Sequence, residues 1–372
     1  MIYKDYKGIN LSRLGMGNMR LPTAGGERGA PIDREHARKM IEYCMANGIN
    51  YYDTAYVYHG GESEKFLGEV LPKYPRDSYH IATKYFVMAT EDYKGAFEEQ
   101  LERLKTDYID FYLMHGIFDH SWQRYIEGGA VEYFAEQKEK GRIKYLGFSS
   151  HVNNEIFVNF LNHRQWDFCM LGINCFDWLY GTVKKDYELL VEKGVPVIAM
   201  NPVRGGRLTL SPSAMAMLKE AQPDWSLTEW ALRWIKRLPG VNVVLSGMSS
   251  LEQLIQNTAL FQDKETMTDA EAQLLLDACR TFKEEVSLPC TDCGYCVEPC
   301  PMDIEIPKML DVYNRSKTDG PRAIRRVDEV ESKGKPQDCT GCGVCNSHCP
   351  QSIDISAAMT EMGEIIRNRP AR

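Results

Sequence analysis

The 372-residue sequence lacks three features that mark large classes of proteins. It has no apolar run near the ~18–20 residues that a membrane-spanning helix needs. Its first residues, Met1–Tyr6, carry a Lys–Asp pair where a signal peptide would need an apolar stretch. It has 44 basic against 52 acidic residues, a formal net charge of −8, and no block of Lys or Arg that would form a local basic patch. We therefore expect a soluble, cytoplasmic protein that binds neither membranes nor nucleic acid.

The sequence also lacks a G-x-G-x-x-G turn after an early strand, the mark of a doubly wound dinucleotide-binding sheet. Over roughly the first 265 residues, apolar β-rich runs alternate with helical patterns. Strands are expected at 14–21, 49–53, 79–84, 108–115, 143–149, 168–174, 195–203 and 241–247. Helices are expected at 34–46, 63–70, 93–104, 130–140, 154–162 and 227–235. Eight such units predict an α/β fold of the (β/α)₈ TIM barrel type, with an open doubly wound sheet as the alternative.

Cysteine is unevenly distributed: eight of the twelve cysteines lie beyond residue 289 in two compact groups. The other four share no ligand-like spacing and are expected to be buried apolar side chains: Cys44, Cys169, Cys175 and Cys279. A disulfide framework does not fit a cytoplasmic chain, so the clustered eight indicate metal or cluster ligation. We expect a barrel domain at residues 1–285 and a second domain at residues 286–372.

Both cysteine groups have the spacing C-x₂-C-x₂-C-x₃-C-P, at 290–301 and at 339–350. Three thiolates at two-residue gaps can wrap one face of a cubane, while the fourth, next to proline, reaches a second cluster. The spacing therefore predicts two [4Fe–4S] clusters with crossed ligation. The ligands would be Cys290, Cys293, Cys296 and Cys349 for the first cluster, and Cys339, Cys342, Cys345 and Cys300 for the second. Zinc is the alternative for a C-x₂-C pair, but two complete quartets disfavour it.

The 38 residues between Cys300 and Cys339 exceed what a compact bacterial ferredoxin uses. Segments 308–313 and 323–332 have helical patterns. We therefore expect a small, mainly α-helical ferredoxin-like domain. His348, beside the last cysteine, is expected to be solvated or packed rather than a ligand.

Four different polar side chains fall at the ends of successive expected strands. Asp53, Lys84 and His115 each close a strand, and Tyr58 lies in the loop after Asp53. In a (β/α)₈ barrel these ends form the reactive rim. Lys84 would pair with Asp53 and lower the pKa of the Tyr58 phenol from ~10. Tyr58 would then donate a proton to a carbonyl oxygen that receives a hydride, and His115 would orient the substrate.

The segments Asp53-Thr-Ala-Tyr-Val-Tyr58, Ile-Ala-Thr-Lys84 and Asp107-Tyr-Ile-Asp-Phe-Tyr-Leu-Met-His115 resemble the aldo/keto reductase signature. The resemblance extends over roughly residues 1–265. It implies an oxidoreductase in which Asp53, Tyr58, Lys84 and His115 form the catalytic tetrad. The implied substrate is a small carbonyl or alcohol, and the implied cofactor is NAD(P)H.

The resemblance also implies where the nucleotide binds. Ser149 and Ser150 would lie near the carboxamide, the 201–207 loop along the pyrophosphate, and residues 247–257 around the adenosine. The implied contacts are Ser149, Ser150, Asn201, Arg204, Gly205, Gly247, Gln253 and Asn257, with Arg207 as a further phosphate contact. The family commonly has Lys and Arg for a 2′-phosphate where Gly247 and Gln253 stand here. We therefore predict that NADH binds at least as well as NADPH.

A nicotinamide passes two electrons as hydride, whereas clusters pass one electron at a time. Three arrangements would reconcile a two-electron nicotinamide with one-electron clusters. The clusters are structural or redox-sensing beside an ordinary reductase, a flavin in the altered pocket splits electron pairs, or an external electron donor or acceptor drives single-electron chemistry. A redox-sensing regulatory protein on a non-catalytic barrel is the non-enzyme alternative, which the complete set of four rim residues disfavours.

Overall fold

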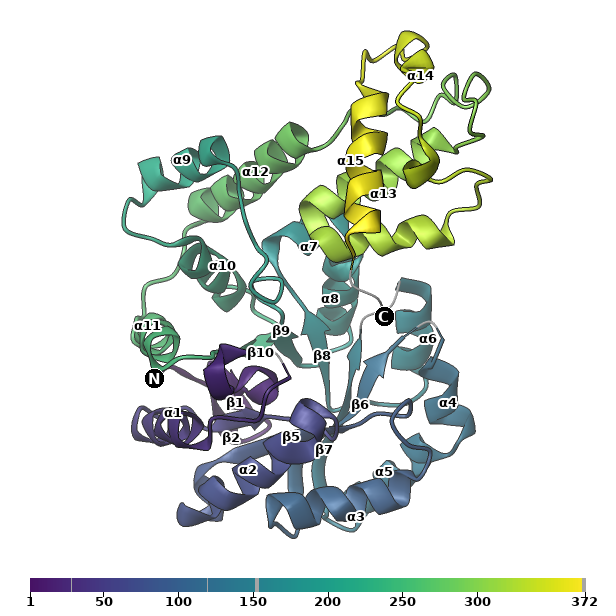
Figure 1. Ribbon diagram of the computed structural model, residues 1–372. Helices are drawn as coiled ribbons and strands as arrows, with labels where there is room; N and C mark the ends of the chain where they lie inside the picture. The colour runs from purple at the N-terminus through teal and green to yellow at the C-terminus, as the bar shows by residue number, and fades with distance from the viewer. Residues whose placement is uncertain (28, 119, 151–153, 370–372) are drawn as a thin grey trace. The chain divides into compact units, whose positions relative to one another are not determined.

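The computed structural model describes residues 1–27, 29–118, 120–150 and 154–369 (Figure 1). The chain divides into two compact units, one formed by residues 1–208 and 224–276 and the other by residues 209–223 and 277–372. The domain boundary expected between residues 285 and 286 stays a prediction. None of the helices in the described part of the chain is long and apolar enough to cross a membrane.

Eight parallel strands close into a barrel in the first unit, in the order β10-β3-β4-β5-β6-β7-β8-β9 (Figure 1). They are β3 Leu14–Gly17, β4 Tyr51–Asp53, β5 His80–Tyr85, β6 Ile109–Ile117, β7 Ile143–Ser150, β8 Phe168–Gly172, β9 Val197–Met200 and β10 Val241–Ser246. Nearly all their residues are buried, as parallel strands covered by helices require. The predicted (β/α)₈ barrel is confirmed and the open sheet is excluded. The strand expected at 14–21 was too long, because a 3₁₀ turn begins at Asn18.

The helices around the barrel follow the strands as expected from their apolar spacing. They are α1 Arg34–Ala46, α2 Glu62–Val70, α3 Tyr93–Leu104, α4 Trp122–Glu127, α5 Ala130–Glu139, α6 Asn154–Asn162, α7 Cys175–Tyr180, α8 Val183–Glu192, α10 Leu227–Lys236 and α11 Leu251–Gln262. Side-chain caps start several of them; Asp33 and Asp92, for example, each accept a hydrogen bond from the backbone N–H three residues later. The sequence analysis missed α4, α7 and α8, although Val183, Tyr187 and Leu190 form a buried stripe on α8.

A two-stranded hairpin, β1 Tyr3–Tyr6 and β2 Ile9–Ser12, precedes the barrel. The side chains of Tyr6 and Leu11 are buried in one cluster with Phe111 and Phe168 of the barrel interior. Phe111 and Phe168 lie in the N-terminal halves of β6 and β8, so the hairpin covers the N-terminal end of the barrel. The opposite rim is left for chemistry.

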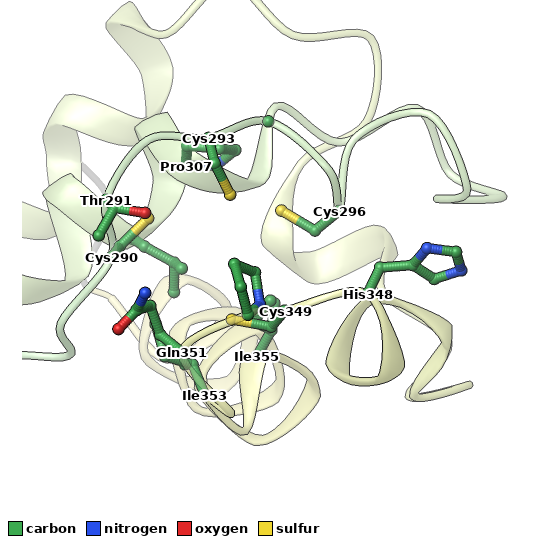
Figure 2. A pocket seen from close by; sticks show the side chains of 13 residues that line it. Cys290, Thr291, Cys293, Cys296, Pro307, His348, Cys349, Gln351, Ile353 and Ile355 are labelled. Atoms are coloured by element: carbon green, nitrogen blue, oxygen red, sulfur yellow. The ribbon is translucent and has the colours of Figure 1, made fainter.

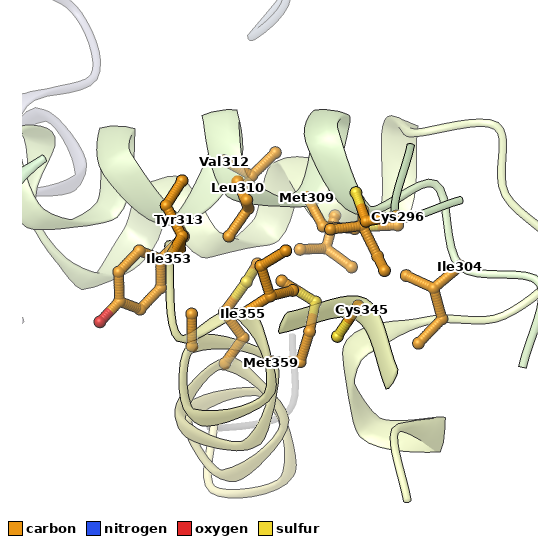
Figure 3. Packing of buried hydrophobic residues seen from close by; sticks show 14 of the residues in the cluster. Cys296, Ile304, Met309, Leu310, Val312, Tyr313, Cys345, Ile353, Ile355 and Met359 are labelled. Atoms are coloured by element: carbon orange, nitrogen blue, oxygen red, sulfur yellow. The ribbon is translucent and has the colours of Figure 1, made fainter. Parts of the chain in front are cut away.

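The second unit is mainly helical, and its helices are α9 Pro212–Ala221, α13 Ile306–Asp319, α14 Val344–Ser347 and α15 Ile355–Arg367, together with the later part of α12 Asp269–Val286. Its apolar core includes Leu310, Ile355 and Met359, and the cysteines Cys296 and Cys345 border the same core (Figure 3). The helix expected at 308–313 is the longer α13. The segment expected as a helix at 323–332 forms instead a 3₁₀ helix over 321–329.

Candidate functional site

Four polar groups meet at the C-terminal rim of the barrel, where neighbouring strands β4, β5 and β6 end. The Lys84 ammonium is buried and donates to both carboxylate oxygens of Asp53, each at 2.7 Å, and to the Thr54 carbonyl oxygen at 2.6 Å. Its Nζ also lies 3.4 Å from the phenol oxygen of Tyr58. The Tyr58 and His115 rings stand edge to face, with centroids 5.6 Å apart. The structure therefore brings all four residues predicted at the rim together.

Burial controls the acidity of this group more than expected. It raises the pKa of the Tyr58 phenol, and the adjacent Lys84 ammonium offsets only part of that rise. Lys84 thus acts in the expected direction, but the pKa of Tyr58 does not fall below its ordinary value because burial outweighs the effect of the lysine. Burial also disfavours the Lys84 ammonium, but contact with Asp53 outweighs this effect and raises the Lys84 pKa. At neutral pH the lysine is charged and the phenol carries its proton, the form that a general acid requires.

A second polar network lies behind Lys84. The Glu64 carboxylate has no exposed surface, and it accepts hydrogen bonds from Thr83 at 2.5 Å, Gln100 at 2.7 Å and Arg103 at 3.0 Å. The Gln100 amide also donates to the backbone carbonyl oxygen of Lys84 at 3.1 Å. This network fixes the end of β5, and the sequence analysis missed it because its members come from α2, α3 and β5.

Glu64→Ala is expected to lower the free energy of unfolding by about 3–5 kcal/mol, because it leaves buried donors of Arg103 and Gln100 without their acceptor. Glu99→Ala is the matched control, since Glu99 pairs with the same guanidinium at 2.5 Å but its side chain is 45% exposed. That control should cost about 0–1 kcal/mol. Anaerobic urea titrations measure both values, and equal losses would show that Glu64 does not hold the network.

The side chains expected at the carboxamide and adenosine ends of a nucleotide are partly used by the fold itself. The buried hydroxyl of Ser149 accepts a hydrogen bond from the Gly116 backbone N–H at 2.7 Å. Ser150 is buried at the end of β7. The buried amide of Asn257 donates to the Ser246 hydroxyl at 3.1 Å. Ser149 therefore ties the end of β7 to β6, and Asn257 ties α11 to the end of β10.

The 201–207 loop follows the seventh barrel strand, β9. Asn201 is exposed and has a left-handed backbone with φ of 55°. The Arg204 guanidinium lies 3.2 Å from the Asp177 carboxylate and over the Phe176 ring. Arg207 is exposed, and its Nε donates to the Arg204 carbonyl oxygen at 3.4 Å. Arg204 is thus already neutralised by a carboxylate, which weakens it as a phosphate ligand.

The loop after the eighth barrel strand, β10, and the first turn of α11 carry the remaining expected contacts. The Gln253 side chain accepts a hydrogen bond from the Ser249 backbone N–H at 2.9 Å, and Gly247 is exposed. Arg20, which the sequence analysis missed, lies against Gly247 and donates to the Gly205 carbonyl oxygen at 2.9 Å. No motif marks Arg20, since it meets these loops only through the closure of the barrel.

The predicted cluster ligands surround two hollows in the second unit. Cys290, Cys293, Cys296 and Cys349 line the first, and Figure 2 shows their sulfur atoms pointing into it while the His348 ring points away. The second hollow is lined by Cys300, Cys339, Cys342 and Cys345. Gly294 and Gly343, with φ of 78° and 70°, allow the tight turn before the third cysteine of each motif.

These hollows have the chemistry of cluster sites. All eight cysteines are free thiols. Across the described residues, no three His, Cys, Asp or Glu side chains close on a single metal ion. The four thiols that line each hollow match the Cys₄ ligand set of a [4Fe–4S] cluster.

Two family models match the chain, one for each part. Residues 13–276 match the aldo/keto reductase family model, and residues 289–353 match a model described as a 4Fe-4S dicluster domain. The uncharacterized oxidoreductase YqkF of Bacillus subtilis is 28% identical over 290 residues, 67% of this chain and 87% of the relative. The L-galactose dehydrogenase of Arabidopsis thaliana is 28% identical over 303 residues, 72% of this chain and 92% of the relative.

Solved structures give the same result for the barrel. The holo form of the aldo-keto reductase AKR11C1 from Bacillus halodurans superposes with a TM-score of 0.62 at 28% identity, covering 75% of this chain and 96% of that one. The family match spans the whole barrel and all four rim residues. The chain therefore belongs to the aldo/keto reductase family and is an oxidoreductase of that type with a C-terminal iron–sulfur domain.

Proposed function

We propose that the protein transfers hydride between a nicotinamide nucleotide and a small carbonyl or alcohol substrate, with Tyr58 as the general acid. The observation that carries this proposal is the buried Lys84 ammonium, held by Asp53 and lying 3.4 Å from the Tyr58 phenol oxygen. The nicotinamide supplies the hydride when it is bound, and the protein must supply the proton.

The roles of the rim residues follow from their geometry. Tyr58 donates its phenolic proton to the developing alkoxide, and Lys84 stabilises the phenolate that remains. Asp53 keeps Lys84 charged and fixed in position. His115, whose ring contacts that of Tyr58, orients the carbonyl oxygen toward the phenol. In the oxidative direction the same groups accept the proton of an alcohol.

Anoxic turnover assays with NADH and NADPH test this proposal. Aldehydes, ketones and sugar alcohols are the substrates to try, the last because one relative is named L-galactose dehydrogenase. Reduction or oxidation that depends on nucleotide supports hydride transfer. The absence of nucleotide-dependent turnover, together with flavin released on denaturation, would favour a flavin-linked enzyme instead.

We expect the protein to bind NADH at least as tightly as NADPH. Gly247 and Gln253 provide no cation for a 2′-phosphate, and charge-assisted contacts of that kind are worth about 1.5–3 kcal/mol each. Dissociation constants from fluorescence titration in anoxic buffer measure the preference. Tenfold or tighter binding of NADPH would mean that other residues supply the charge.

We also propose two [4Fe–4S] clusters with the crossed ligand sets, Cys290, Cys293, Cys296 and Cys349 for one and Cys339, Cys342, Cys345 and Cys300 for the other. The two hollows, each lined by one of these sets, support the proposal. The clusters would exchange electrons with an external partner or sense redox state. We propose that the protein works in the cytoplasm, a reducing compartment in which cysteines stay reduced. We propose that this domain begins at residue 286 and the barrel ends at residue 285.

A further inference from the structure

Arg20 bridges the two loops that follow the seventh and eighth barrel strands. It ends the 3₁₀ turn Asn18–Arg20 after β3, on the same rim as the four polar groups. Its guanidinium Nη2 donates to the Gly205 carbonyl oxygen at 2.9 Å, in the 201–207 loop. Its own carbonyl oxygen accepts a hydrogen bond at 2.9 Å from the hydroxyl of Ser249, in the loop after β10.

Two glycines leave the space in which the Arg20 side chain lies. A Cβ atom at Gly247 would be only 3.3–3.4 Å from Cβ, Cγ and Cδ of Arg20, so the arginine stem takes the place of a side chain there. A Cβ atom at Gly205, where φ is 67°, would lie 3.2 Å from the arginine Nη2. The Arg20 side chain thus lies close to the backbone of both loops.

The charge of Arg20 is not neutralised within the described part of the chain, where it has no carboxylate within ion-pair distance. Its side chain is exposed, and one carbonyl oxygen uses only one of the five N–H donors of a guanidinium. The neighbouring Arg204, by contrast, is paired with Asp177. An exposed, unpaired guanidinium held in a fixed position is suited to bind an anion.

The surroundings favour a phosphate group. In (β/α)₈ barrels, phosphate frequently binds between the loops after strands seven and eight and the N-terminus of a following helix. Here that helix is α11, which starts after its capping residue Ser250 and adds a positive dipole end to the same loop. Arg20 reaches across both loops at this place.

We propose that Arg20 binds the diphosphate of the nucleotide, as a cation supplied from the first barrel loop. The inference rests on the proposed nicotinamide function. A diphosphate is common to NADH and NADPH, so this contact gives affinity without selecting between them. The bridge between the two loops would also keep the diphosphate in place.

Binding measurements on Arg20→Ala test this role directly. We expect the dissociation constants of NADH, NADPH and ADP-ribose each to rise by about 10- to 100-fold, and that of adenosine to stay unchanged. Arg20→Lys should recover part of the affinity. Arg38→Ala, which removes a half-buried arginine of α1, is the control and should bind as the wild type does.

The possible outcomes separate the two proposals. If Arg20→Ala binds these ligands as tightly as the wild type does, the role of Arg20 is overturned and the nicotinamide proposal stays intact. If the variant loses affinity for NADPH alone, Arg20 binds the 2′-phosphate, and its proposed role at the diphosphate is also overturned. If wild-type protein with full iron content binds none of these ligands, both proposals fail. Iron content and circular dichroism of each variant establish that it is folded.

Discussion

Tyr58→Phe should lower kcat for carbonyl reduction by about 10²–10⁴-fold and leave the dissociation constant of the nucleotide nearly unchanged. The substitution removes the phenolic proton of Tyr58, whose oxygen lies 3.4 Å from Lys84 Nζ, while the ring that contacts His115 remains. Steady-state kinetics and fluorescence titration, both without oxygen, separate the effect on chemistry from any effect on binding.

Tyr56→Phe is the matched control for this variant. Tyr56 lies two residues earlier in the same loop, but its hydroxyl donates to Glu99 at 2.8 Å and not to a rim group. Its loss should change kcat by less than about threefold, as expected for a surface substitution away from the chemistry. Near-normal kcat in Tyr58→Phe would mean that another group donates the proton, or that no hydride reaches a carbonyl.

Cys300→Ser should remove the cluster held mainly by the later cysteine motif, although Cys300 belongs to the earlier one. Iron and labile sulfide, each about eight per chain in the anaerobic wild type, should both fall toward about four. The reason is spatial: Cys300 lines the same hollow as Cys339, Cys342 and Cys345. Colorimetric iron and sulfide analysis measures the loss.

Double variants identify which cluster is lost. If Cys300 and Cys345 serve one cluster, combining their serine substitutions removes no more iron than either alone. Combining Cys300→Ser with Cys296→Ser should remove both clusters. Cys44→Ala, in α1, is the control and should keep all the iron. The opposite pattern, with Cys300 and Cys296 acting together, would contradict the crossed assignment.

The barrel and its rim could be predicted because both depend on local patterns. Apolar runs set the strands, and Asp53, Lys84 and His115 fall at or near their ends whatever the details of packing. The cysteine spacing likewise predicted which four thiols line each hollow. The iron content itself remains a prediction.

Local sequence patterns do not predict contacts between segments that are far apart in the chain. The bridge of Arg20 to Gly205 and Gly247 exists only when the first, seventh and eighth strands of the barrel are neighbours in space. The Glu64 network has the same origin. The direction of the Tyr58 pKa was missed because the charge of Lys84 is visible in the sequence, whereas the burial that outweighs it is not.

The packing of Arg20 on Gly247 links the evolution of these two positions. A Cβ atom at position 247 would stand 3.3 Å from the Arg20 side chain, so any larger residue there requires that side chain to shift. A substitution of Gly247 would therefore also move Arg20. We expect substitutions at the two positions to occur together among relatives that differ in nucleotide preference.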